Sequence, residues 1–121
     1  MADCIPYAIH VVTGKDLDLV KDLARQRDWD PDLGMNGIAG WYLLRDMGYQ
    51  ISQIKSADRI TLKKFLPTLN PRKTYIISVT EHWFAVRNGV RFDKAKSNPR
   101  CEVGYYFEVE EPIIKDVRSK L

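Results

Sequence analysis

The sequence is poor in the residues that mark several large classes of protein. Two cysteines in 121 residues are too few for a secreted scaffold held together by disulfides. No apolar run approaches the ~18 residues that a membrane-spanning helix needs, which excludes an integral membrane protein. The N-terminus lacks the basic and apolar stretches of a secretory signal, and the sequence contains no glycine-rich phosphate-binding loop. We therefore expect a cytoplasmic protein that does not bind nucleotide through one of the common loops.

What the chain does contain is typical of one globular domain. Hydrophobic residues make up 45%, aromatic residues 11% and charged residues 29%, and the net charge is +3. No internal repeat or linker interrupts the sequence, so residues 1–121 are expected to form a single domain. Its polar C-terminal segment, 110–121, is expected to be a loosely docked tail. The mild positive charge permits nucleic-acid binding but does not require it.

The first part of the chain has the patterns of three helices. Apolar side chains recur at helical spacing over residues 4–13 and 16–27, and a third run ends at Met47. Asp3 and Asn36 precede the first and third runs, where a short polar side chain can cap a helix N-terminus. The segment between the second and third runs is rich in turn-forming residues and is expected to be a loop.

The rest of the chain changes to patterns typical of strands. Asn88-Gly89, between two apolar runs, predicts a two-residue type I′ turn and hence a β-hairpin. Pro67 is expected to end a short helical segment that begins at Thr61. Helices followed by an antiparallel sheet predict an α+β fold. The expected strands span residues 49–54, 74–79, 82–87, 90–93 and 102–109.

Cys4 is the first residue of the expected N-terminal helix, a position that favours a thiolate. The positive end of the helix dipole stabilises an anion there, and a reactive cysteine needs such help because free thiols are mostly protonated at neutral pH. The neighbouring Asp3 carboxylate opposes this effect. The alternative is that Cys4 is a small buried hydrophobe on the same stripe of the helix as Ala8 and Val11.

His82 begins a strand that is otherwise apolar, and the predicted hairpin brings it near Asp93. With Asn88-Gly89 as the turn, Phe84 lies opposite Asp93, so His82 and Asp93 are diagonal neighbours ~7–8 Å apart at the backbone. Asp93 can then accept a hydrogen bond from one ring nitrogen and leave the other nitrogen free, as a catalytic triad requires. The alternative is a surface ion pair, and a one-residue slip of the turn would separate the two side chains.

Five short motifs together carry a family resemblance. They are DCIPYAI at 3–9, TG at 13–14, HWFAV at 82–86, NG at 88–89 and FD at 92–93. In this order they resemble the small papain-like cysteine peptidases, in particular the short phage and bacterial proteins akin to the peptidase domains that process bacteriocin leaders. Ovarian-tumour-type deubiquitinases, which belong to the same clan, begin in a similar way and are the alternative.

The resemblance implies a papain-like fold, in which N-terminal helices pack on a C-terminal antiparallel sheet, and a cysteine peptidase that needs no cofactor. Cys4 would be the nucleophile, His82 the general base and later the general acid, and Asp93 the group that orients the imidazole. The reaction would be hydrolysis of a peptide or isopeptide bond through a thioester. A phage or bacterial source, and hence the cytoplasm of the bacterium or host, is also implied.

The sequence departs from the family at the oxyanion hole. Papain-like enzymes commonly place a glutamine several residues before the nucleophile, whereas only three residues precede Cys4. Asn36 is the candidate for the missing donor. Because losing one such donor typically costs ~3–4 kcal/mol in the barrier, a papain-like binding module without turnover is the second hypothesis. It would hold a partner protein or nucleic acid through a basic rim around Asp93. The rim consists of Arg91, Lys94, Lys96 and Arg100.

The histidines and cysteines do not predict a metal site. Zinc ligands usually come in closely spaced pairs, and the sequence contains no such pair. Cys4 and His10 fall on different faces of one helix, so no metal is expected there. Cys101 is expected to be an ordinary thiol in a loop.

Overall fold

The computed structural model describes residues 2–80 and 82–110. Within them, helices are followed by an antiparallel sheet, which confirms the predicted α+β class. The helices are α1 (Cys4–Thr13), α2 (Leu17–Arg25), α3 (Gly37–Asp46) and α4 (Leu62–Phe65), and α4 continues as the 3-10 helix η1 (Leu66–Thr68). The strands are β1 (Gln50–Ile51), β2 (Lys55–Ser56), β3 (Thr74–Val79), β4 (His82–Arg87), β5 (Val90–Phe92) and β6 (Val103–Glu110).

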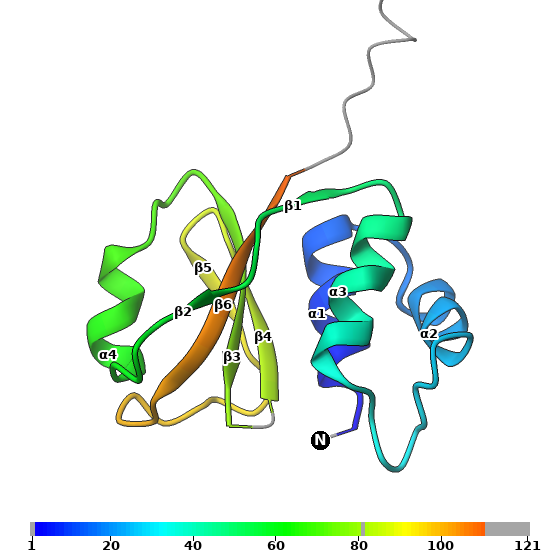
Figure 1. Cartoon of the computed structure of the whole chain (residues 1–121), viewed down its shortest axis with the longest axis horizontal. Coiled ribbons are helices and arrows are strands. Elements are labelled where there is room, and N and C mark those ends of the chain that lie inside the picture. Colours follow the sequence, from blue (N-terminus) through cyan, green and yellow to red (C-terminus); the bar gives the residue numbers. More distant parts are fainter. Residues whose placement is uncertain (1, 81, 111–121) are drawn as a thin grey trace, which may run out of the picture.

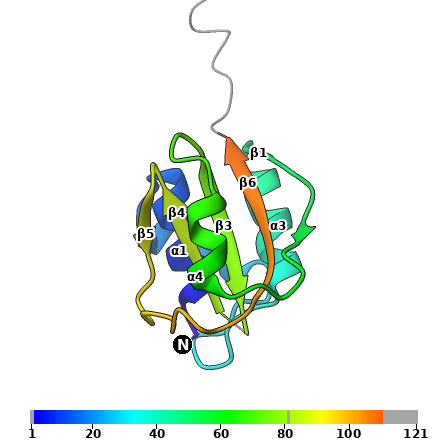
Figure 2. The ribbon, with the colours of Figure 1, turned by 90° about the vertical axis from the view of Figure 1, so that its left-hand side faces the viewer.

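Strands β6, β3 and β4 form the centre of the sheet. The strand order is β1-β6-β3-β4-β5, and β2 also pairs with β6. Every pairing is antiparallel. Strand β3 is buried along all but its first residue, as its continuous apolar sequence predicts for a central strand. Figure 2 shows β5 at one edge of the sheet and β6 on the other side of β3.

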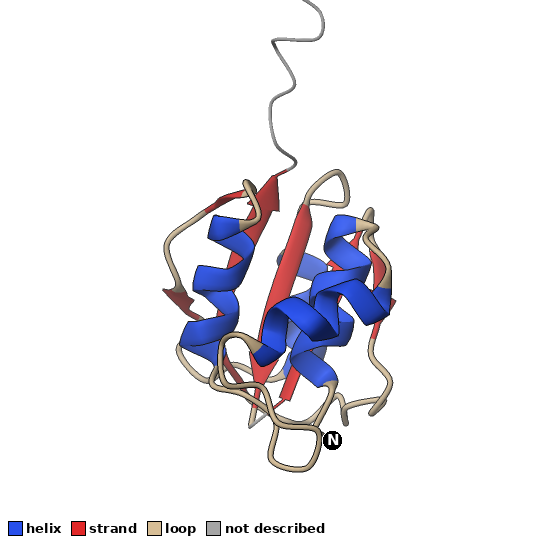
Figure 3. Ribbon diagram, turned by 90° about the vertical axis from the view of Figure 1, so that its right-hand side faces the viewer, coloured by secondary structure: helices blue, strands red, loops and turns tan. Residues whose placement is uncertain are grey.

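Helices cover both faces of the sheet. Helices α1, α2 and α3 lie on one side and α4 on the other (Figure 1), and the first three stand in front of the strands in Figure 3. Successive side chains of β4 point to opposite faces of the sheet. Trp83 and Ala85 pack beneath α1–α3, whereas Phe84 and Val86 pack towards α4. Within the described part of the chain, the core therefore consists of two apolar clusters, one on each face of the sheet.

The turn predicted at Asn88-Gly89 is confirmed. Both residues have positive φ, 53° and 78°, as a type I′ turn requires. Arg87 pairs with Val90 directly across the turn, so the register is that of a two-residue loop. This register gives His82 and Asp93 the same face of the hairpin, as predicted.

Two predicted element boundaries are wrong for local reasons. The second helix ends at Arg25 rather than two residues later, because Asp28 adopts a φ of 67° that no right-handed helix contains. The strand expected over 49–54 is only the two residues of β1, and the separate two-residue strand β2 follows beyond its predicted end. Between them the Ser52 hydroxyl accepts from the backbone N–H of Glu108, which replaces a ladder bond with a side-chain bond.

Two further segments end elsewhere than predicted. Pro67 lies inside η1 instead of ending a helix, since it stands in the first turn, where a missing N–H costs little. Glu110 belongs to β6 and not to a tail. The remainder of the predicted tail, 111–121, lies outside the described residues.

Gly40 marks the closest approach of α3 to its neighbours. A Cβ at this position would lie 2.8 Å from both Ile5 Cγ2 and the Trp83 ring, closer than van der Waals contact allows. We expect Gly40→Ala to lower the free energy of unfolding by about 1–3 kcal/mol, as measured by urea titration. Gly104→Ala is the control, because a Cβ there meets only Ser78 O at 3.6 Å. Equal stability of the two variants would contradict this packing.

Candidate functional site

The first residues of α1 and α3 lie at one end of the molecule, together with the last residues of β3 and the first residues of β4 (Figure 1). A cavity of about 600 Å³ lies at this end. Its walls include Cys4, residues 32–37, Ser78, His82, Trp83 and Tyr105. Cys4 and His82, which are far apart in the sequence, therefore share one cavity.

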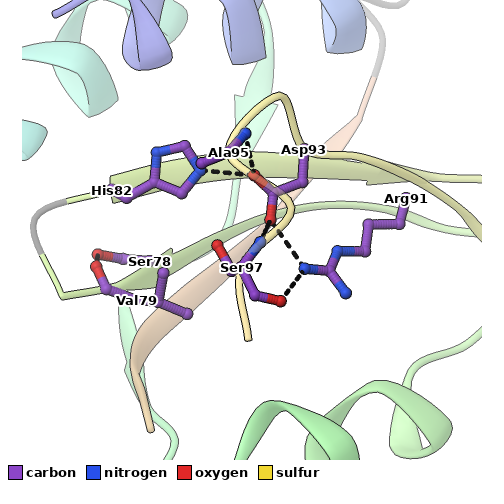
Figure 4. A network of polar contacts seen from close by, with 7 residues as sticks. All are labelled: Ser78, Val79, His82, Arg91, Asp93, Ala95 and Ser97. Atoms are coloured by element: carbon purple, nitrogen blue, oxygen red, sulfur yellow. Dashed lines mark hydrogen bonds and ion pairs between the residues drawn. The ribbon is translucent and has the colours of Figure 1, made fainter. Parts of the chain in front are cut away.

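His82 and Asp93 are in direct contact. His82 Nε2 lies 2.7 Å from Asp93 Oδ1 (Figure 4), so the contact predicted from the hairpin register is confirmed. The side chain of Asp93 is 1% exposed and that of His82 is 12% exposed. This burial distinguishes the pair from a surface ion pair, whose members are hydrated and interact weakly.

The Asp93 carboxylate is saturated with hydrogen-bond donors. Arg91 Nη2 and the backbone N–H of Ser97 donate to Oδ2, each at 2.9 Å, and the N–H of Ala95 donates to Oδ1 at 3.1 Å. Burial raises the pKa of Asp93, but the hydrogen bonds from Arg91, His82 and Ser97 outweigh it and hold that pKa well below its usual range. Asp93 is therefore a permanent carboxylate at neutral pH.

The carboxylate determines which nitrogen of His82 is free. An ionised carboxylate only accepts hydrogen bonds, so Nε2 carries the hydrogen and Nδ1 is the basic nitrogen of the neutral ring. Figure 4 shows the second ring nitrogen on the side of the ring away from Asp93. Among the described residues, no group makes a hydrogen bond with Nδ1. His82 is thus oriented as a base with one nitrogen available.

Cys4 lies where the sequence places it, at the first residue of α1, and it is 8% exposed. The prediction that Asp3 caps this helix through its side chain is wrong. Asp3 has φ −103° and ψ 12° rather than the extended backbone of a capping residue, and its Oδ2 instead lies 3.2 Å from Lys94 Nζ. The first-turn amides therefore have no side-chain cap, and Lys94 offsets the negative charge beside the thiol.

The segment before Cys4 is held in place by the loop that follows α2. Trp29 Nε1 donates to Ala2 O at 2.8 Å. Asp30 and Gly34 pair through two backbone hydrogen bonds, and Gly34 lies against Ala2. The N-terminal residues are thus fixed by contacts with a distant part of the chain, which keeps the start of α1 at the cavity.

Cys4 and His82 reach the cavity from different sides of the sheet. Cys4 belongs to the apolar cluster beneath α1–α3. His82 lies on the same face of β4 as Phe84, which packs towards α4, and the centres of their rings are 6.2 Å apart. Within residues 2–80 and 82–110, no hydrogen bond joins the thiol to the imidazole. The two groups meet only at the end of the sheet, where both line the cavity.

Asn36 has the structural role that its position predicts. Its Oδ1 accepts from the N–H of Ile38 at 2.7 Å, which caps α3. Asn36 also lines the cavity, but its side chain is exposed and its oxygen is used by the cap. Only its amide NH₂ is left to serve as the oxyanion donor proposed from the sequence.

The basic rim is less positive than the sequence suggests. Arg91 pairs with Asp93, and its guanidinium also donates to Ser97 O at 2.7 Å. Lys94 pairs with Asp3. The Arg91–Asp93 contact was not predicted, although the sequence carries a signal for it, because residues two apart along a strand lie on the same face. Two of the four rim cations are therefore paired with carboxylates of the same chain, and this weakens a nucleic-acid interface.

The described residues contain no group of three or more His, Cys, Asp or Glu side chains that could hold a metal ion. Within the same residues, the longest and most apolar helices fall short of what a membrane crossing requires. Comparison with protein-family models, curated proteins and solved structures finds no match. The chemistry of the site is therefore inferred from its own geometry.

Proposed function

We propose that this protein is a thiol-dependent hydrolase with a papain-like arrangement of its helices and sheet, acting on a peptide or isopeptide bond. Cys4 is the nucleophile, His82 the general base and acid, and Asp93 the residue that orients the imidazole. The observation that carries the proposal is the buried His82–Asp93 hydrogen bond at the edge of a cavity that also holds a cysteine at a helix N-terminus.

The reaction begins with transfer of the Cys4 proton to His82 Nδ1. The thiolate attacks the carbonyl carbon, an S–C bond forms, and the carbonyl oxygen becomes an oxyanion. When the C–N bond breaks, the imidazolium returns its proton to the departing amine, which leaves a thioester on Cys4. Water then attacks the thioester, gives a proton to Nδ1 and releases the acid, and the proton returns to sulfur.

Asp93 supports this cycle by remaining charged throughout. It stabilises the imidazolium that forms in each half of the reaction, and it keeps Nδ1 rather than Nε2 as the basic nitrogen. Its own hydrogen bonds from Arg91, Ala95 and Ser97 fix its position, so the imidazole is oriented by a group that cannot rotate freely. Since the thiol and imidazole share no hydrogen bond, we expect their contact to form when a substrate fills the cavity.

Peptide chloromethyl ketones and a ubiquitin-derived electrophilic probe test this function. We expect them to label Cys4. Intact-mass analysis should find one adduct, mapped to Cys4, although Cys101 is the more exposed thiol. His82→Ala should abolish the preference for Cys4, and Cys4→Ala should remove the adduct. Equal, slow labelling of both thiols in the folded protein would overturn the proposal and favour a binding module. Reaction with the ubiquitin-derived probe alone would indicate a deubiquitinase.

A further inference from the structure

Tyr105 places a hydroxyl group in the wall of the same cavity. Trp83 Nε1 lies 2.7 Å from Tyr105 Oη. An indole nitrogen can only donate, so the tyrosine oxygen is the acceptor and its own hydrogen is not spent on this bond. Among the residues that the structure describes, no acceptor for that hydrogen is found. The hydroxyl is therefore a donor with its hydrogen available to the cavity.

The position of this hydroxyl is closely determined. Trp83 is 3% exposed, so the indole that holds the hydroxyl is fixed in the core. Gly37, the first residue of α3, lies against both groups, because a Cβ there would come within 2.2 Å of Tyr105 Oη and 3.1 Å of Trp83 Nε1. Gly37 leaves the space that the hydroxyl occupies. The donor is thus held against a buried indole and a helix start in the cavity that Cys4 also lines.

We infer that the Tyr105 hydroxyl donates a hydrogen bond to the oxyanion that forms when Cys4 attacks a carbonyl group. This inference rests on the proposed function and deepens it. Tyr105 and Cys4 line the same cavity, so the hydroxyl is in the space that a substrate carbonyl bound at the thiol would occupy. The backbone N–H of Cys4, in the uncapped first turn of α1, is one donor, and Tyr105 supplies the second.

Other polar side chains in the cavity are weaker candidates for this role. The Ser78 hydroxyl already donates to the backbone oxygen of Val79, at 3.4 Å. Asn36 is exposed, and its side-chain oxygen is used to cap α3. Tyr105 alone among the three has a buried neighbour that polarises the hydroxyl, because accepting from Trp83 strengthens the hydroxyl as a donor.

The test compares two reactions of Cys4 that differ in whether an oxyanion forms. Acylation by p-nitrophenyl acetate passes through a tetrahedral oxyanion and releases p-nitrophenolate, whereas alkylation by iodoacetamide displaces iodide and forms no oxyanion. We expect Tyr105→Phe to slow acylation by about 10²–10³-fold and to leave alkylation unchanged. Stopped-flow release of p-nitrophenolate and intact-mass analysis of Cys4 measure the two rates.

Two further variants complete the test. Tyr106→Phe is the matched control, because Tyr106 packs against Phe65 on the far face of the sheet and should alter neither rate. Gly37→Ala keeps the Tyr105 hydroxyl but should displace it, and it should therefore slow acylation. Unchanged acylation in both Tyr105→Phe and Gly37→Ala would overturn the inference alone. Wild-type protein that alkylates at Cys4 but is not acylated there would overturn the proposed function as well.

Discussion

Replacing Asp93 with alanine is expected to lower the free energy of unfolding by about 3–5 kcal/mol. The carboxylate is 1% exposed and accepts from two side chains and two backbone amides, so its loss leaves His82 Nε2 and the amides of Ala95 and Ser97 without their acceptor and Arg91 with only Ser97 O. Removing one partner of such a network costs more than the network contributes as a whole, because the remaining polar groups lose their acceptor in a partly buried site. Urea denaturation at pH 7, followed by tryptophan fluorescence, measures the change.

The pH dependence of stability provides a second readout for the same residue. The pKa of Asp93 is lower in the folded state than in the unfolded state, so its contribution is fully present above the unfolded value of about 4. As the pH falls below that value, only the unfolded chain takes up the proton, and stability is lost. In Asp93→Asn, the free energy of unfolding should fall less steeply as the pH is lowered below about 4 (the acid limb of the stability curve). A loss below 1 kcal/mol for Asp93→Ala, or an unchanged acid limb for Asp93→Asn, would contradict the buried network.

The parts of the molecule that depend on neighbouring residues could be predicted from the sequence. The Asn88-Gly89 turn fixes the register of β4 and β5 within a few residues, and the His82–Asp93 contact follows from that register. The cap at Asn36 is likewise a contact with a residue two positions away. In each case the chain has few conformations that satisfy the local pattern.

The parts that depend on distant residues could not be predicted. Asp3 pairs with Lys94 instead of capping its helix, and Ala2 is held by Trp29; neither partner is a neighbour in sequence. The hydroxyl of Tyr105 faces the cavity only because Trp83 and Gly37 flank it after the sheet and helices have packed. Such contacts depend on the angle at which helices cross the sheet, which short motifs do not encode.

The alternation of β4 explains why the sequence leaves the thiol–imidazole contact undetermined. The same alternation that buries Trp83 beneath α1 gives His82 the opposite face, at the end of the strand. Helix α1 presents Cys4 to the cavity from the other side. Catalysis therefore requires the imidazole and the thiol to come into contact at the end of the sheet. The rates at which Cys4 is acylated in variants of His82 and Asp93 test whether they do.

His82→Ala is expected to slow acylation of Cys4 by p-nitrophenyl acetate at pH 7 by about 10²–10⁴-fold, because the variant has no base to take the thiol proton. Asp93→Asn should cause a large loss of its own. The double variant should be no slower than His82→Ala, since Asp93 acts on the reaction only through the imidazole that it orients. Urea titrations identify conditions in which all the variants are folded.

The dependence of these rates on pH separates catalysis from structural damage. Raising the pH ionises thiols without a base, so the rate for His82→Ala should approach that of the wild type in alkaline solution if the cavity is intact. A variant that is merely distorted would remain slow at every pH. Additive losses in the double variant would show that Asp93 acts independently of His82. Such a result would leave the pair as a structural feature of the hairpin rather than part of a catalytic triad.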